Sequence, residues 1–196
     1  MSDASPQPAP RRRTIATTPF GPVVIVWARR GADAKVVRVL LSRPMSPADA
    51  QAAAVYPGAL EASCLEVEVL AGSLAALLEG APVEIPLDLA ELDACPAFQH
   101  AVLRAEHAIP RGRVSTYGLL AAQLGRPTAA RAVGNALARN PFPLIVPCHR
   151  AIRSDGRLGG YQGGSAMKRA LLAMEGARFD EQGRVRGAAL HYAASS

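Results

Sequence analysis

The stretch Asn140–Arg150 (NPFPLIVPCHR) constrains the fold of this chain more than any other part of its sequence. An apolar run, residues 142–146, lies there between prolines and ends just before Pro147 and Cys148. Short apolar runs bounded in this way are typical of a buried strand or extended segment. The sequence therefore predicts a buried segment that carries a cysteine, a histidine and an arginine at its end.

Cys148 is the candidate nucleophile of this stretch. It is followed by His149 and Arg150, and neighbouring cations lower the pKa of a thiol. The thiolate is the form of cysteine that attacks electrophiles. A free cysteine is, however, more often a small buried core residue, so this stretch alone leaves both interpretations open.

A histidine that acts as a base needs an orienting partner, usually a carboxylate. Residues that are adjacent in an extended segment point to opposite sides. His149 would therefore reach the sulfur through a water, or from a turn that begins at the cysteine. Only three acids lie between residues 97 and 178, namely Glu106, Asp155 and Glu175, and Glu175 at the end of a helix is the best candidate.

Charge divides the chain into two parts. Residues 1–96 contain 8 Lys+Arg and 11 Asp+Glu, whereas residues 97–178 contain 12 Lys+Arg and 3 Asp+Glu. A basic half beside a mildly acidic half indicates that the second half binds a polyanion such as nucleic acid. Arginine-rich coding bias explains why 20 of the 22 cations are Arg, but it does not explain the asymmetry.

Three cysteines, Cys64, Cys95 and Cys148, are too few and too widely spaced for a disulfide framework or a zinc site. We expect no metal and no organic cofactor. No apolar run reaches the roughly 18 residues of a membrane span, and the polar N-terminus lacks the apolar region of a secretory signal. The expected location is the cytoplasm, with no membrane contact.

The predicted fold class is α/β (α+β). Residues 1–13 are expected to be a disordered arm, and residues 14–92 a small α/β domain with a three-stranded antiparallel sheet that buttresses the second half. Residues 93–178 are expected to form a mostly helical domain, followed by a weakly patterned tail, residues 179–196. In the first domain, strands are predicted at 14–18, 23–28 and 36–42 and helices at 47–55 and 60–79.

Two short helices at 116–124 and 129–138, joined by a glycine-containing turn, predict a helix-turn-helix. Ser115 or Thr116 is expected to cap the first helix and Thr128 the second. The second helix presents small residues and one cation; these are Ala129, Ala130, Arg131 and Gly134. A base-reading helix carries several polar side chains, whereas a smooth helix with one long cation suits a protein that extrudes a base. A tightly packed core helix remains the alternative.

The glycine-rich loop at residues 159–164 starts about ten residues after Cys148 and is expected to fold back over it. Glycines allow close approach of backbone to a ligand. Tyr161 offers a flat face on which a base can stack. The loop is therefore a candidate pocket, although a plain turn is the simpler interpretation of the glycines alone.

Several ordered motifs together resemble the O6-alkylguanine-DNA alkyltransferases, also called methylated-DNA–protein-cysteine methyltransferases. The resemblance is strong from Pro96 to Gly176 and holds only in outline before it. The motifs are Pro96-x-Phe98-Gln99, Ile109-Pro110-x-Gly112-x-Val114-x-x-Tyr117, Ala130–Gly134, Asn140-Pro141, Pro147–Arg150, Gly160-Tyr161 and Leu171-Leu172-x-x-Glu175-Gly176.

This resemblance implies direct-reversal DNA repair. Cys148 would accept the alkyl group of O6-alkylguanine irreversibly, once per molecule, and O4-alkylthymine is a second candidate substrate. His149 would act through a water with Glu175 behind it, and Asn140 would hold the turn before the nucleophile. Tyr117 would press on the phosphate and donate a proton to the leaving base.

The resemblance also implies how DNA is bound. The protein would act as a monomer on the minor groove of double-stranded DNA, with Arg131 replacing the extruded base. The expected pocket residues are Pro147, Ala151, Gly160, Tyr161 and Gln162. Ala151 and Gln162 depart from common family residues, which puts the packing and width of the pocket in doubt.

Other functional classes compete with this one. A non-catalytic sensor of alkylated bases would bind damaged DNA without modification of its thiol. A cysteine hydrolase would need an oxyanion-binding loop, which is not evident in the sequence. A transcription regulator would need base-reading side chains on the second helix.

Overall fold

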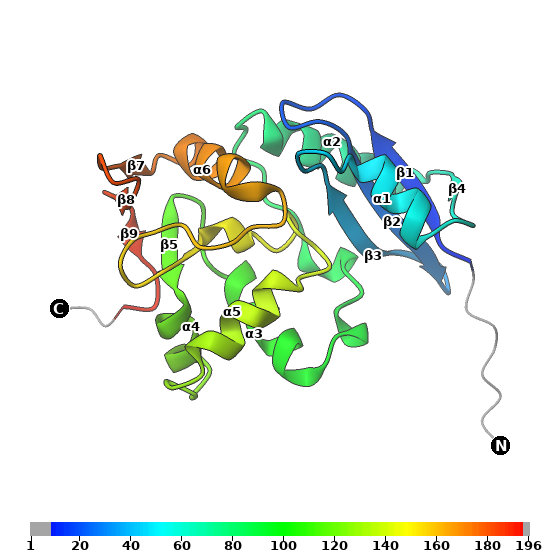
Figure 1. Ribbon diagram of the computed structural model, residues 1–196. Coiled ribbons are helices and arrows are strands. Elements are labelled where there is room, and N and C mark those ends of the chain that lie inside the picture. The colour runs from blue at the N-terminus through cyan, green and yellow to red at the C-terminus, as the bar shows by residue number, and fades with distance from the viewer. Residues whose placement is uncertain (1–8, 194–196) are drawn as a thin grey trace, which may run out of the picture.

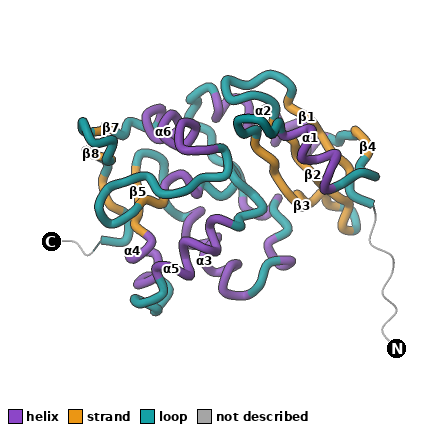
Figure 2. The backbone as a smooth tube through the Cα atoms, in the orientation of Figure 1, coloured by secondary structure: helices purple, strands orange, loops and turns teal. Residues whose placement is uncertain are grey.

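The chain folds into two halves that share a hydrophobic core (Figure 1). The structure is a computed structural model, and it describes residues 9–193. Strands lie mainly in the N-terminal half and helices mainly in the C-terminal half (Figure 2). The largest core cluster contains buried residues of both halves, from Val23 to Leu171. The predicted mixed α/β class is confirmed.

A four-stranded sheet forms the N-terminal half, in the order β3-β2-β1-β4. Its strands are β1 (Arg11–Ile15), β2 (Val23–Arg30), β3 (Asp33–Leu41) and β4 (Leu60–Glu61). The first three pair antiparallel, as the sequence predicts, and β4 adds a fourth strand parallel to β1.

Strand β1 corrects the predicted extent of the disordered arm. Arg11–Arg13 pair with β2 rather than lying in an arm. Arg11 lies over the Trp27 ring at 5.4 Å, and Arg13 forms an ion pair with Glu68 at 2.8 Å. These contacts order a sequence whose charge alone predicts disorder. Residues 1–8 of the predicted arm lie outside the described residues.

Helices cover both faces of this sheet. Helix α1 (Ala48–Val55) packs with Val24, Val26 and Leu40 on one face. Helix α2 (Leu65–Leu78) packs on the other face, with the shared core. It begins later than predicted, because Leu60 and Glu61 pair with β1 instead. Two short 3-10 helices, Leu87–Leu89 and Leu92–Ala94, lead into the second half.

The C-terminal half contains four α-helices and five short strands. The helices are α3 (Ala97–His107), α4 (Tyr117–Gln123), α5 (Ala130–Ala138) and α6 (Gly164–Met174). The strands are β5 (Arg113–Thr116), β6 (Ala151–Ile152), β7 (Arg178–Phe179), β8 (Val185–Arg186) and β9 (Ala189–Leu190). The tail adds a strand to each of two small sheets, since β8 pairs with β7 and β9 pairs with β5. Within residues 9–193, none of the helices has both the length and the apolar character that a bilayer span requires.

Helices α4 and α5 form the predicted helix-turn-helix, and one of its two predicted caps is correct. The Thr116 hydroxyl accepts a hydrogen bond from the Leu119 amide at 3.1 Å, as the cap prediction requires. Helix α5 has Ala129 at its N-cap and no side-chain cap, so the predicted role of Thr128 is wrong. The Ala129 amide donates to the Arg126 carbonyl oxygen at 2.8 Å. This turn places Thr128 one residue before the cap position.

The apolar run at residues 142–146 is buried, but it is not a strand. The Val146 amide donates to the Phe142 carbonyl oxygen at 2.8 Å, so the chain turns back on itself. Leu144 takes a positive φ of 75° inside this turn, which is uncommon for a residue other than glycine. Prolines at 141, 143 and 147 remove the amide donors that a strand would use. The turn leads directly into a 3-10 helix, Cys148–Arg150.

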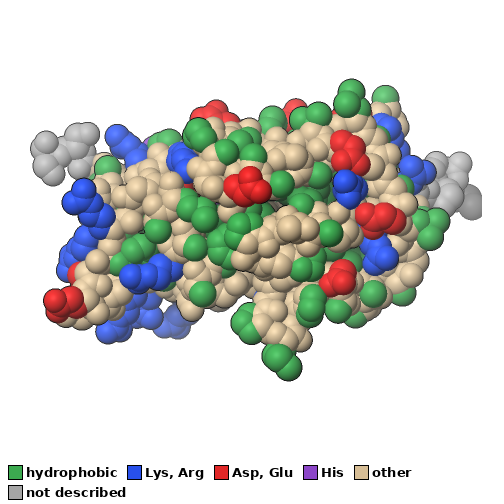
Figure 3. All heavy atoms as spheres, turned by 90° about the horizontal axis from the view of Figure 1, so that it is seen from above, with side chains coloured by type: hydrophobic (Ala, Val, Ile, Leu, Met, Phe, Trp, Pro, Cys, Tyr) green, Lys and Arg blue, Asp and Glu red, His purple; other side chains and the backbone are tan. Residues whose placement is uncertain are grey.

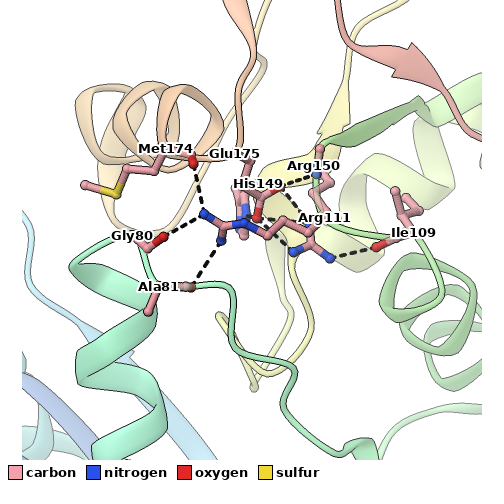
Figure 4. Close-up of polar contacts among 9 residues, drawn as sticks. Gly80, Ala81, Ile109, Arg111, His149, Arg150, Met174 and Glu175 are labelled. Atoms are coloured by element: carbon pink, nitrogen blue, oxygen red, sulfur yellow. Dashed lines mark hydrogen bonds and ion pairs between the residues drawn. The ribbon is translucent and has the colours of Figure 1, made fainter.

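Arg111 ties the two halves together at the ends of two helices (Figure 4). Its guanidinium donates to the carbonyl oxygens of Gly80 at 2.7 Å and Ala81 at 3.3 Å, which follow α2. It also donates to the Met174 carbonyl oxygen at 2.8 Å, at the end of α6. Carbonyl groups at helix C-termini lack partners within the helix and carry partial negative charge. One cation therefore satisfies both helix ends.

Replacing Arg111 with Met should destabilise the protein by about 2 kcal/mol, because charge-assisted hydrogen bonds to both helix ends are lost. Urea unfolding of the variant and the wild type measures this difference. Arg157→Met is the matched control, since Arg157 is exposed and pairs only with Asp155 at the surface. Equal midpoints for the two variants would contradict the proposed tie.

Candidate active site

Cys148 lies at the start of the 3-10 helix and is 6% exposed. Asn140 holds the turn that leads to it. The Asn140 side-chain oxygen accepts from the Phe142 amide at 2.9 Å. Its amide nitrogen Nδ2 donates to the Val146 carbonyl oxygen at 3.3 Å and lies 3.4 Å from the Cys148 Sγ. The predicted role of Asn140 before the nucleophile therefore has a direct geometric basis.

Cys148 opens onto a cavity of about 690 Å³ between the two halves. Of the expected pocket residues, Gly160, Tyr161 and Gln162 line this cavity together with Tyr117. Two others do not: Pro147 lines a separate cavity, and Ala151 is fully buried in β6. The Gln162 side chain donates to the Asn140 carbonyl oxygen, which holds the loop against the turn.

His149 and Glu175 meet as the sequence predicts (Figure 4). The His149 Nε2 lies 3.0 Å from the Glu175 Oε1. Arg150 binds the same carboxylate through two nitrogens, at 2.8 and 2.9 Å, and donates to the Ile109 carbonyl oxygen at 2.7 Å. The Glu175 side chain is only 4% exposed, so this carboxylate is held by two partners almost out of contact with solvent.

Burial and hydrogen bonding together set the protonation of these three groups. It raises the pKa of the Cys148 thiol to about 11, although the Asn140 hydrogen bond acts in the opposite direction. It lowers the pKa of His149, against the effect of Glu175. Burial would raise the pKa of Glu175, but hydrogen bonds from His149 and Arg150 outweigh it and lower that pKa to about 2. The resting site is therefore a neutral thiol beside a neutral histidine and an ionised glutamate.

The ionised carboxylate also selects a histidine tautomer. The ionised Glu175 can only accept a hydrogen bond, so Nε2 carries the hydrogen that it donates to the carboxylate, and Nδ1 is the nitrogen that can take up a proton. Nδ1 is buried, and no group among residues 9–193 forms a hydrogen bond with it. The arrangement can therefore accept a proton from a neighbouring donor at Nδ1.

Tyr117 is fitted between two glycines. A Cβ on Gly134 of α5 would lie 3.9 Å from the Tyr117 ring, and a Cβ on Gly159 would lie 2.6 Å from its hydroxyl. Gly159 also has a positive φ of 72°, so only glycine fits there without strain. Burial, with the negative charges of Glu106 and Cys148, raises the pKa of Tyr117 to about 12. Its hydroxyl therefore stays protonated and can donate.

Tyr161 brings the glycine-rich loop into contact with His149. Its ring meets His149 edge to face, with ring centroids 6.2 Å apart. Its hydroxyl is buried and has no hydrogen-bond partner among residues 9–193. Burial raises the pKa of Tyr161 well above its usual value. A neutral aromatic ring with a free hydroxyl suits contact with a flat polar ligand such as a base.

The predicted DNA-binding residues lie on the helix-turn-helix. Arg131 and Thr128 are exposed, whereas Ala129, Ala130 and Gly134 are half-buried. Helix α5 therefore presents a smooth surface with one protruding cation next to the cavity. Cationic side chains gather at the end of the molecule formed by the C-terminal half, whereas the other end mixes both charges (Figure 3).

Comparison with known proteins supports the predicted family. Residues 97–177 match the family model described as the DNA-binding domain of 6-O-methylguanine DNA methyltransferase. The chain is 42% identical to a methylated-DNA–protein-cysteine methyltransferase of Methanothermobacter thermautotrophicus over 60% of this chain and 66% of that protein. It is 57% identical to the Salmonella typhimurium protein of the same name, over 40% of this chain and 46% of that protein. These sequence matches span about half to two thirds of the relatives' length.

Solved structures extend the likeness over nearly the whole chain. The fold matches the Mycobacterium tuberculosis O6-methylguanine methyltransferase with a TM-score of 0.66 and 32% identity, covering 85% of this chain and 92% of that one. The chain belongs to the O6-methylguanine-DNA methyltransferase family. The M. tuberculosis protein solved in complex with DNA matches equally well, with a TM-score of 0.66 over 84% of this chain and 92% of that one. The family resemblance inferred from the motifs is thereby confirmed.

Two buried charged residues lie next to this site, and no sequence pattern assigns them a role there. Lys168 is fully buried in α6 and donates to the carbonyl oxygens of Ala151 at 2.6 Å and Gly160 at 3.4 Å. It links the strand after the nucleophile to the pocket loop. Glu106 is fully buried in α3, and burial raises the pKa of its carboxyl group to about 8. The one sequence signal for Lys168 is its place on the otherwise apolar face of α6. That signal does not identify the groups to which Lys168 binds.

The N-terminal half also contributes to the cavity, and no sequence pattern predicts this. Arg38, Arg43 and Pro44 line the same cavity as Cys148. They lie more than a hundred residues away in sequence, so no motif connects them with the nucleophile. Among residues 9–193, no three His, Cys, Asp or Glu side chains gather as a metal site would require.

Glu175→Gln should destabilise the protein by about 3–5 kcal/mol at neutral pH, because His149 and Arg150 lose the charge that they share. The pKa of Glu175 is about 2 in the folded protein, against an ordinary value of 4.5. Its stabilising effect is therefore complete above about pH 4.5 and is lost as the pH falls towards 2. The difference in the free energy of unfolding between wild type and variant should therefore become smaller as the pH falls from about 4.5 to 2.

Urea unfolding at a series of pH values measures this gap. Glu181→Gln is the control, because Glu181 is exposed. A gap that stays constant between pH 5 and pH 2 would show that the carboxylate is not held as described.

Proposed function

We propose that this protein repairs DNA by direct reversal. It extrudes O6-alkylguanine from the duplex and transfers the alkyl group irreversibly to Cys148, as a methylated-DNA–protein-cysteine S-methyltransferase. The observation that carries this proposal is the position of Cys148, which lies in the wall of a cavity beside α5, with a histidine–carboxylate pair directly behind it. O4-alkylthymine is a second candidate substrate.

The chemistry follows from the protonation states of the site. The Cys148 thiol gives its proton, through a water, to His149 Nδ1, and Glu175 stabilises the resulting imidazolium. The thiolate attacks the alkyl carbon in line with the bond to O6. The new C–S bond forms as the C–O bond breaks, and the electron pair stays on the guanine.

Tyr117, whose high pKa keeps its hydroxyl protonated until charge develops nearby, donates a proton to that leaving base. The proton held on the His149 imidazolium then returns through solvent to the tyrosinate, so both side chains end neutral. The product on Cys148 is a thioether. A thioether has no carbonyl group for water to attack, so the cysteine is not regenerated. Each molecule therefore acts once and needs no cofactor.

We propose that α5 enters the minor groove of double-stranded DNA. Its smooth face permits close approach to the groove walls, and Arg131 fills the place of the extruded base. The M. tuberculosis relative that was solved in complex with DNA supports nucleic-acid binding. We propose action as a monomer in the cytoplasm, a reducing compartment that suits three free cysteines.

The competing function is a sensor that flips alkylated bases and recruits other repair proteins. A sensor needs the helix-turn-helix and the cavity, but it has no use for a nucleophile. The pairing of His149 with Glu175 behind Cys148 favours transfer over sensing.

Incubation with a duplex containing O6-methylguanine should increase the intact mass by about 14 Da, as expected for one methylene gained on a nucleophilic cysteine. Peptide mapping should place this gain on Cys148. Cys148→Ala should abolish it, whereas the control Cys95→Ala should keep it. Tight binding of the duplex without any mass gain would establish the sensor instead.

Arg131→Ala should slow transfer from a duplex about ten- to hundred-fold. The side chain that fills the place of the extruded base is lost, so extrusion costs more free energy. Transfer from a single-stranded oligonucleotide should change much less, since little stacking opposes extrusion there. Rates of methyl transfer on the two substrates measure this contrast. Arg157→Ala is the control for loss of a surface cation, and equal slowing on both substrates would contradict a wedge role.

A further inference from the structure

The N-terminal half forms part of the wall around Cys148. Arg38 lies on strand β3, and Arg43 and Pro44 lie in the turn after it. The cavity of about 690 Å³ lies within the range of about 300–1,000 Å³ typical of small-molecule sites. It therefore has room for a nucleotide with its flanking backbone, and not only for a methyl group.

The charge of this wall has one sign. It contains three arginines, namely Arg38, Arg43 and Arg139, and no aspartate or glutamate. A guanidinium presents a planar fork of donors that matches the oxygens of a phosphate. A cavity with cations and no carboxylate in its wall is therefore suited to an anionic part of the substrate.

Arg38 and Arg43 differ from other cations of the N-terminal half. Arg12, Arg13, Arg29 and Arg30 each form an ion pair with a glutamate. Among residues 9–193, neither Arg38 nor Arg43 forms an ion pair. The buried Arg38 Nε has no hydrogen-bond partner within that range, and Arg43 donates only to the neutral Gln51 side chain, at 3.3 Å. The guanidinium groups of these two cavity-lining arginines thus lack an anionic partner among the described residues.

Both arginines are held on rigid backbone relative to the nucleophile. The Val39 amide, next to Arg38, donates to the Pro141 carbonyl oxygen at 2.8 Å and so joins β3 to the segment that precedes Cys148. The turn at Arg43 is closed by two backbone hydrogen bonds with Ser46, at 3.1 and 3.0 Å. The Gln51 side chain donates to the Leu41 and Ser46 carbonyl oxygens. A substrate anion in the cavity would therefore meet two arginines whose backbone positions are fixed relative to Cys148.

We propose that Arg38 and Arg43 bind the phosphodiester group beside the extruded nucleotide. The N-terminal half is then a second DNA-contacting element, opposite the helix-turn-helix, and it holds the backbone of the extruded base at the mouth of the cavity. This inference rests on the proposed function, since it takes alkylated duplex DNA as the substrate. Its ligand is the phosphate backbone, so it does not depend on the alkyl group.

The test measures binding without transfer. Cys148→Ala serves as the background, and fluorescence anisotropy follows binding of an O6-methylguanine duplex at a series of salt concentrations. Each lost phosphate contact lowers the slope of log K against log salt by about 0.9. Arg38→Met with Arg43→Met should therefore reduce the slope by about 2 and the affinity about a hundredfold at low salt.

Matched variants separate this role from a structural one. Arg157→Met removes an exposed cation that does not line the cavity and should leave the affinity nearly unchanged. Arg38→Lys with Arg43→Lys keeps both charges and should restore most of the slope. An unchanged slope in the Met variants, or equal weakening by Met and Lys, would overturn the proposal.

Failure of this inference is distinguishable from failure of the proposed function. One outcome is an unchanged salt slope together with a normal mass gain on Cys148 in the protein with Arg38→Met and Arg43→Met. That outcome would rule out the proposed phosphate contact, and the proposal of alkyl transfer would stand. If the protein with all native residues gained no mass, the proposed alkyl transfer would be ruled out, whatever the salt dependence of DNA binding.

Discussion

The site depends on one buried carboxylate. Glu175, at the C-terminal end of α6, accepts hydrogen bonds from His149 and Arg150. Its side chain is almost out of contact with solvent. A buried charge is stable only when hydrogen bonds satisfy it. Here the same hydrogen bonds also position the residues around Cys148. They set the histidine tautomer, fix Arg150 against the Ile109 carbonyl oxygen and bring the end of α6 to the 3-10 helix of the nucleophile. Arg111 then joins that helix end to α2, so the geometry of the site is coupled to the packing of both halves.

The proposed single use of each molecule gives the burial of Cys148 a chemical consequence. Thiolate character and exposure make a cysteine prone to oxidation, and a molecule that loses its only acceptor sulfur is useless. A thiol with its pKa raised by burial avoids this in the resting state. The histidine–glutamate pair makes ionisation possible when an electrophile occupies the cavity. Reactivity therefore depends on the presence of the substrate rather than on a permanently ionised cysteine.

Local signals carried most of what the sequence predicts correctly. Helix anchors, the Thr116 cap and the nearness of Cys148, His149 and Glu175 follow from patterns within one half of the chain. The errors have physical causes. Prolines and the positive φ of Leu144 turn an apolar run that resembles a strand, and cation contacts order Arg11–Arg13 despite their charge. Lys168 and Arg38 could not be assigned, because their partners are brought together only by tertiary folding.

The contact between the halves covers the edge of strand β3 and also supports the turn before Cys148. Strand β3 lies at the edge of its sheet, and an exposed edge presents unpaired amides that promote aggregation. The Val39 amide instead donates to the Pro141 carbonyl oxygen. Behind this hydrogen bond, Val39 and Leu41 share the core with Phe142 and the rest of the turn before Cys148. That turn has few backbone hydrogen bonds of its own, since its prolines lack amides. Its shape therefore depends on the Asn140 side chain and on what the turn packs against. For this reason the N-terminal half is part of the candidate active site, even though none of its side chains is proposed to react.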